Sequence, residues 1–164
     1  MTGAAREVHI EVVLLAPTAR GLSYRVVRAP LPARAAPDEH AIGLAGLVDG
    51  RPGAVCHSTS WRTEDELVVL TYAATPDPSP QQAAPLDEPS VICSQDPLRP
   101  RPLHVHAHHV AAHAARHLAF LADHDPTVQE ALQQVPELLA RLHALAATVP
   151  VAPHGLAHAL ARTR

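Results

Sequence analysis

The sequence contains no lysine and no asparagine, and only four of its 164 residues are aromatic: one Trp, one Phe and two Tyr. All thirteen basic residues are arginines, and they form no basic stripe that could follow a phosphate backbone. So few aromatic side chains also exclude a surface on which nucleic-acid bases stack. We therefore expect no nucleic-acid partner.

Cysteine is scarce, and long apolar runs are missing. The chain has two cysteines, and a compact apolar run such as residues 12–16 is far short of the roughly 20 residues that cross a bilayer. Residues 1–7 do not resemble a signal peptide. We expect a cytoplasmic protein with reduced thiols and no membrane association. A glycine-rich phosphate loop is also missing, so no nucleotide cofactor is indicated.

Alanine and histidine are abundant instead. The many alanines, together with the missing lysine and asparagine, are typical of a bacterial genome with a high G+C content. Histidine codons carry no such bias, yet there are thirteen histidines, ten of them between positions 104 and 158. The net charge is −3 with neutral histidines. It would become +10 if all thirteen were protonated, which requires a pH below about 6.5.

The length and the composition indicate one folded domain over residues 1–164. Hydrophobic residues make up 47% of the chain and charged residues 18%, which is enough for one apolar core. Residues 8–74 form a β-rich half in which alternating apolar residues and turn signals predict an antiparallel meander of about five strands. The predicted strands are residues 8–15, 22–28, 42–48, 54–59 and 66–74.

Residues 75–102 are a proline-rich connection with one short strand at 91–93. The apolar spacing then becomes helical over residues 103–164. One helix is predicted over 105–122 and a second over 126–149, with Asp125 as its N-cap and a kink or break near Pro136. A short helix over 154–161 follows.

The fold class is therefore α+β, with two long helices and a short C-terminal helix packed on one face of a mainly antiparallel sheet. The predicted core residues are Ile10, Val12, Leu14, Val26, Val68, Leu70, Tyr72, Leu118, Leu121, Leu132, Leu139 and Leu142.

The histidines of the first long helix form a stripe. At about 100° per residue, His106, His109, His113 and His117 lie on one side of the helix, beside its apolar face. Two histidines four residues apart can bind the same metal ion, and imidazole suits zinc and other transition metals. His154 and His158 form another such pair.

These spacings predict a transition-metal site made by His109, His113 and His117 and completed by His154 or His158. Such a metal could activate a water molecule for hydrolysis, with Asp123 or Asp125 as the candidate base.

An alternative is a non-catalytic interaction or regulatory domain. In that case the imidazoles are structural, or they tune packing with pH. A homodimer through the second long helix also remains open, because that helix carries a heptad-like apolar row.

Overall fold

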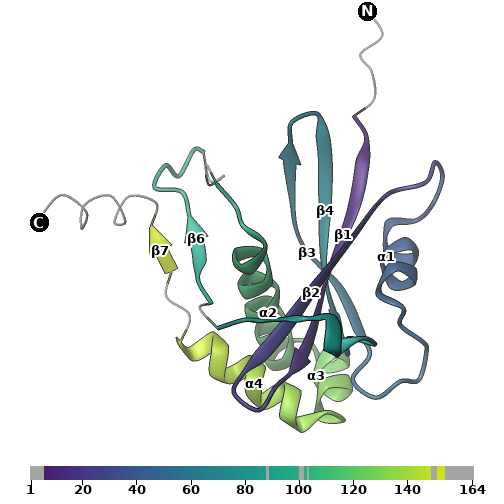
Figure 1. The fold of residues 1–164 in the computed structure, drawn as a ribbon, viewed down its shortest axis with the longest axis vertical. Coiled ribbons are helices and arrows are strands. Elements are labelled where there is room, and N and C mark those ends of the chain that lie inside the picture. Colours follow the sequence, from purple (N-terminus) through teal and green to yellow (C-terminus); the bar gives the residue numbers. More distant parts are fainter. Residues whose placement is uncertain (1–5, 88, 100–101, 103, 149–150, 154–164) are drawn as a thin grey trace, which may run out of the picture.

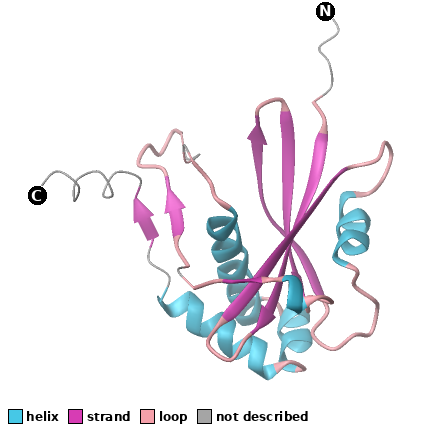
Figure 2. Cartoon of the chain, viewed as in Figure 1, coloured by secondary structure: helices cyan, strands magenta, loops and turns pink. Residues whose placement is uncertain are grey.

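A computed structural model describes the chain except for residues 1–5, 88, 100–101, 103, 149–150 and 154–164. The fold is α+β, as predicted: a five-stranded, mostly antiparallel sheet with helices packed on it (Figures 1 and 2). The sheet has the strand order β3-β4-β1-β2-β5. Its strands are β1 (Val8–Pro17), β2 (Leu22–Pro30), β3 (Val55–Glu64), β4 (Leu67–Thr75) and β5 (Ala84–Pro85).

The sheet is not a simple meander, because β1 and β4 are parallel neighbours. Helix α1 (Pro37–Ala45) connects the β1–β2 hairpin to the β3–β4 hairpin and returns the chain to the free side of β1. The strand predicted over 42–48 is wrong, since residues 42–45 belong to this helix. Pro37 begins the helix, acidic residues occupy its first turn, and Gly46 ends it with φ +65°.

Strand β3 is longer than predicted and contains a β-bulge between Ser58 and Ser60. It continues to Glu64 and reaches β4 through a two-residue turn at 65–66. A bulge adds one residue and so changes which side chains share a face. His57 pairs with Ala73 before the bulge and Arg62 pairs with Val69 after it, so both project from the same face of the sheet.

Both faces of the sheet are covered by helices. Helices α2 (Ala107–His124), α3 (Pro126–Gln133) and α4 (Pro136–Thr148) pack on one face, as predicted, whereas α1 packs on the other (Figure 1). Val13 and Leu15 on β1 point toward the C-terminal helices and are 0% exposed, although the alternating pattern suggested only one buried face.

Most of the predicted core is confirmed. Eight of the twelve residues are buried: Ile10, Val12, Leu14, Tyr72, Leu118, Leu121, Leu132 and Leu142. Val26, Leu70 and Leu139 are partly buried and pack against the two clusters, and Val68 is half-buried. The core is therefore aliphatic and rich in alanine, which lets α2 lie close to the sheet.

The C-terminal half also follows the predicted pattern. Asp125 caps α3 by accepting hydrogen bonds from the amides of Thr127 (2.9 Å) and Val128 (3.2 Å), and Pro136 separates α3 from α4. Strand β6 (Val91–Cys93) forms at the predicted position and pairs in parallel with β7 (Val151–Pro153). The helix predicted over 154–161 lies outside the described residues. Among the described helices, none is long and apolar enough to cross a membrane.

Candidate functional site

Six histidines on and around α2 fall into two groups rather than one continuous stripe. The first group stands at the start of the helix and comprises His106, His108 and His109, with ring centroids 4.0 to 5.7 Å apart. The second comprises His113 and His117, four residues apart on α2, and His57 on β3. We call the second group the three-histidine cluster.

His109 has a structural contact at the helix N-terminus. Its Nδ1 accepts a hydrogen bond from the backbone amide of His106, the N-cap residue, at 3.2 Å. This is the contact that Glu or Gln usually makes at the same position of a capping box. One ring nitrogen of His109, predicted as a metal ligand, is therefore used to cap the helix.

The three-histidine cluster brings together side chains that are far apart in the sequence. The ring centroids of His57 and His117 are 5.4 Å apart, and those of His113 and His117 are 6.4 Å apart. Two of the predicted ligands, His113 and His117, are therefore neighbours as expected, and the sheet contributes a third imidazole.

His117 is the half-buried centre of this cluster. Its Nε2 is buried and has no hydrogen-bond partner among the residues that the structure describes, which is a costly state for a polar atom. Burial lowers the pKa of the His117 imidazole, and the neighbouring His57 and His113 lower it further through charge repulsion. The lowered pKa favours the neutral form of the ring, which is the form that binds metal ions.

His57 is oriented by its own strand. Its Nδ1 lies 2.9 Å from the carbonyl oxygen of Ser58, so a proton on Nδ1 would leave Nε2 with a free lone pair. His57 is not among the site residues predicted from the sequence. Its neighbour Cys56 projects from the opposite face of β3 and packs against the core under α1, where burial and then Asp38 raise its pKa to about 11. The bulge that directs His57 toward α2 has no clear signal in the sequence.

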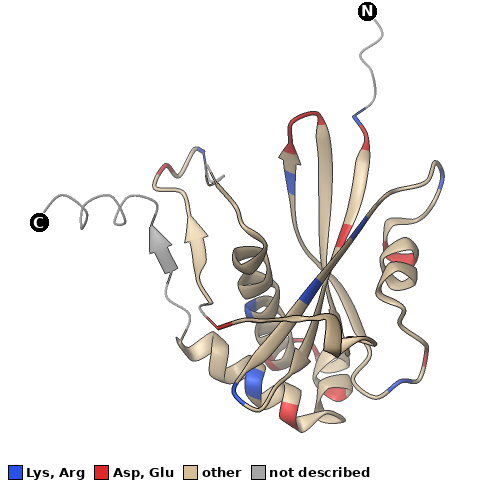
Figure 3. Ribbon diagram, viewed as in Figure 1, with Lys and Arg blue, Asp and Glu red and all other residues tan. Residues whose placement is uncertain are grey.

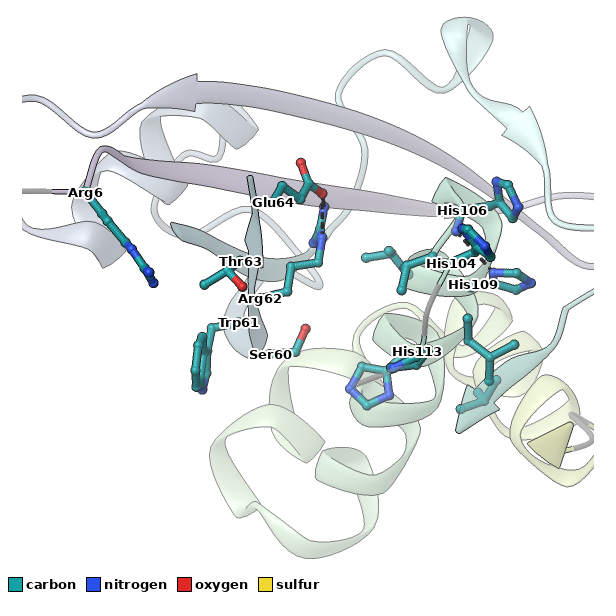
Figure 4. Close-up of a pocket in the computed structure, with 15 residues that line it drawn as sticks. Arg6, Ser60, Trp61, Arg62, Thr63, Glu64, His104, His106, His109 and His113 are labelled. Carbon is teal, nitrogen blue, oxygen red and sulfur yellow. Dashed lines mark hydrogen bonds and ion pairs between the residues drawn. The ribbon is translucent and has the colours of Figure 1, made fainter. Parts of the chain in front are cut away.

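A groove of about 840 Å³ opens beside the cluster, between the end of β3 and the start of α2 (Figure 4). His113 belongs both to the cluster and to the lining of this groove. Figure 4 shows Arg6 and Trp61 on one side and the labelled histidines on the other. The remaining lining residues are Ser60, Arg62, Thr63, Glu64, Val91, Ile92, Pro102, His104, Val105, His106, His109 and Val110.

A chain of ion pairs forms the sheet side of the groove. Arg62 donates to both oxygens of Glu11 (2.8 and 2.9 Å) and to Oε1 of Glu64 (2.7 Å). Arg28 donates to the other oxygen of Glu64 at 2.7 Å. Figure 3 shows acidic and basic positions on β1, β2 and β3, and the two arginines and two glutamates of this chain of ion pairs cancel in charge.

The other predicted site residues lie elsewhere or are not described. Asp125 is the cap of α3, and Asp123 pairs with His143 of α4, with 3.1 Å between Oδ1 and Nε2. Asp123 is ten residues from His113, or about 15 Å along a helix. His154 and His158 lie outside the described residues.

Within the described part of the chain, no three His, Cys, Asp or Glu side chains already converge in a way that could hold a metal ion. The rings of the three-histidine cluster are neighbours, but they do not converge on one point in this structure. Searches against protein-family models and against curated protein sequences find no match to this chain.

Proposed function

We propose that the protein binds a transition-metal ion, best matched by zinc, through His57, His113 and His117. The observation that carries the proposal is the buried Nε2 of His117, which has no hydrogen-bond partner among the described residues, on a ring with two further imidazoles as neighbours. A metal ion at this point would satisfy that nitrogen. The lowered pKa of His117 favours the proposal, because metal and protons compete for the same lone pair.

The spacing of the rings supports the same assignment. With Zn–N distances of about 2.0–2.1 Å, two imidazoles on one tetrahedral ion have ring centroids about 5 Å apart. The His57–His117 separation of 5.4 Å is close to this value, whereas the His113–His117 separation of 6.4 Å has to shorten by about 1 Å. His113 is half-buried and faces the groove, so its side chain has room to rotate toward His117.

Three imidazoles leave the fourth position of a zinc ion open for water, as in catalytic zinc sites. Hydrolysis by a metal-activated water is the reaction that such a site supports, and the groove beside His113 would admit the substrate. We assign no base, because Asp125 caps α3 and Asp123 is paired with His143.

Competitive titration of metal-free protein with Zn²⁺ and a chromophoric chelator tests this proposal. We expect one equivalent to bind, and we expect H57A, H113A and H117A each to lower the affinity at least tenfold. H124A is the matched control, because His124 lies on the same helix but bonds to the Phe120 carbonyl. Co²⁺ in place of zinc should give the visible absorption of a tetrahedral site. Equal losses in all four variants, or no binding by the wild type, would overturn the assignment.

A second candidate function is proton-linked regulation of a non-catalytic interaction domain. The observation in its favour is again the depressed pKa of His117 beside two other imidazoles. This function predicts a pH-dependent change in packing that persists in EDTA and that weakens gradually as successive histidines are replaced. A metal site instead loses metal binding when a single ligand is replaced.

The setting that we propose is the cytoplasm, because both cysteines are free thiols. We also propose that the chain forms a homodimer through α3 and α4. Sedimentation velocity of the full chain would test it, with a monomer at all concentrations as the contrary result.

A further inference from the structure

The groove beside the cluster has a chemistry of its own that does not depend on a metal ion. Among the described residues that line it, Arg6 is the cation without an ion-pair partner. Arg62 also lines the groove, but Glu11 and Glu64 already neutralise its charge. Among its described lining residues, the groove therefore carries one uncompensated positive charge, contributed by Arg6.

One wall of the groove is apolar. Strand β6 contributes Val91 and Ile92, and the segment leading into α2 contributes Pro102 and Val105, followed by Val110 on the helix itself. Val105 is 40% exposed, which is a large exposed fraction for a valine. An apolar wall of this kind is favourable for the hydrocarbon part of a ligand.

Size narrows the choice of ligand. A volume of about 840 Å³ lies in the range of small-molecule sites and is too large for an inorganic anion alone. A single unpaired cation matches a single negative charge. The imidazoles of His104 and His106 add polar groups at the end of the groove opposite Arg6 (Figure 4).

We propose that this groove binds an amphipathic organic monoanion, with its apolar body against Val91, Ile92 and Val105 and its charged group at Arg6. The proposal goes beyond metal binding, because neither Arg6 nor the apolar wall is part of the three-histidine cluster. A carboxylate or sulfonate on an aromatic or aliphatic body has the required chemistry.

The probe for the experiment is 1-anilinonaphthalene-8-sulfonate, and its uncharged counterpart is N-phenyl-1-naphthylamine. The only tryptophan of the chain, Trp61, lines the groove and serves as the donor for energy transfer to either probe. Binding should saturate at one equivalent in EDTA, which separates this proposal from the metal site. A metal-free protein that binds neither probe would refute the groove proposal and leave the zinc titration unaffected.

Two matched pairs of surface variants test the two halves of the groove. R6Q should weaken sulfonate binding about two- to fivefold, as expected of an exposed ion pair, without changing the affinity for the uncharged probe. R51Q, an exposed arginine outside the groove, should change neither affinity.

V105D should weaken both probes at least fivefold. V48D is its control, because Val48 is 67% exposed and does not line the groove. All four positions lie at the surface, so the variants should remain folded. Equal effects within either pair would mean that the probe binds elsewhere on the protein, and that result would overturn the proposal.

Discussion

The pair of Glu11 and Arg62 offers a sharp test of how the sheet side of the groove is stabilised. The Glu11 carboxylate is 8% exposed and accepts from both terminal nitrogens of Arg62 and from Thr71 Oγ1 at 3.2 Å. Removing one partner of a buried ion pair costs about 3–5 kcal/mol, whereas removing both charges is often close to neutral. The two single variants should therefore differ from the double variant in a specific way.

The free-energy cost of each single variant depends on the contacts that the remaining residue of the pair keeps. In R62M, Glu11 keeps only the Thr71 hydroxyl, so the full cost of about 3–5 kcal/mol applies. In E11Q, Arg62 keeps Glu64, which is 39% exposed, so the cost should fall to about 2 kcal/mol. The double variant E11Q/R62M should be more stable than R62M alone, with a coupling free energy of about 2–3 kcal/mol.

Urea denaturation followed by far-UV circular dichroism measures the free energy of unfolding of all four proteins. Trp61 fluorescence provides a second, independent probe of the same transition. The reasoning is refuted if the double variant loses the sum of the two single losses, because the residues would then not act as a buried pair.

The remaining predictions concern His117, two glycines and Cys56. The lowered pKa of His117 means that the unfolded chain binds a proton more readily than the folded protein does. Metal-free protein should therefore become less stable as the pH falls through about 6.5 toward the lowered folded-state pKa. H117Q should lose less stability than the wild type in thermal melts between pH 8 and 5.5. G53A should destabilise the protein by about 1–3 kcal/mol, because Gly53 has φ +74° and a Cβ there would lie 2.5 Å from Val135 Cγ2. G43A, inside α1 with nothing within 4 Å, should instead stabilise by about 0.5–1 kcal/mol, and urea titrations that rank the two variants in the opposite order would contradict this account. Cys56, with its pKa raised to about 11, should react with Ellman's reagent at pH 8 far more slowly than it does in urea; an equal rate in folded protein would argue against its burial.

The helical half was readable from the sequence because its signals are local. Pro136 cannot continue a helix, and Asp125 followed by Pro126 is a strong start signal, so α3 and α4 separate where the sequence indicates. The short strand β6 was also found, since its β-branched residues stand alone in a proline-rich segment.

The sequence did not predict helix α1 or the parallel pairing of β1 with β4, and the reason is that the signals for both are ambiguous or not local. Residues 42–48 are short and apolar, a pattern that fits a strand or a helix equally well, and the helix start at Pro37 was not predicted. Once that segment is a helix, it can carry the chain across the sheet and place β4 parallel to β1. Strand order depends on contacts distant in sequence, which periodicity does not encode.

For the candidate site, the sequence by itself determined that histidines line one side of a helix and that His113 and His117 are neighbours, because helical spacing fixes both. Tertiary structure alone decided the rest. The β-bulge in β3 directs His57 toward α2, and the packing of α2 on the sheet buries the Nε2 of His117. Packing of α2 against α4 also pairs Asp123 with His143. Spacing along one helix specifies which side chains face the same way, but only the packing of separate elements specifies what they meet.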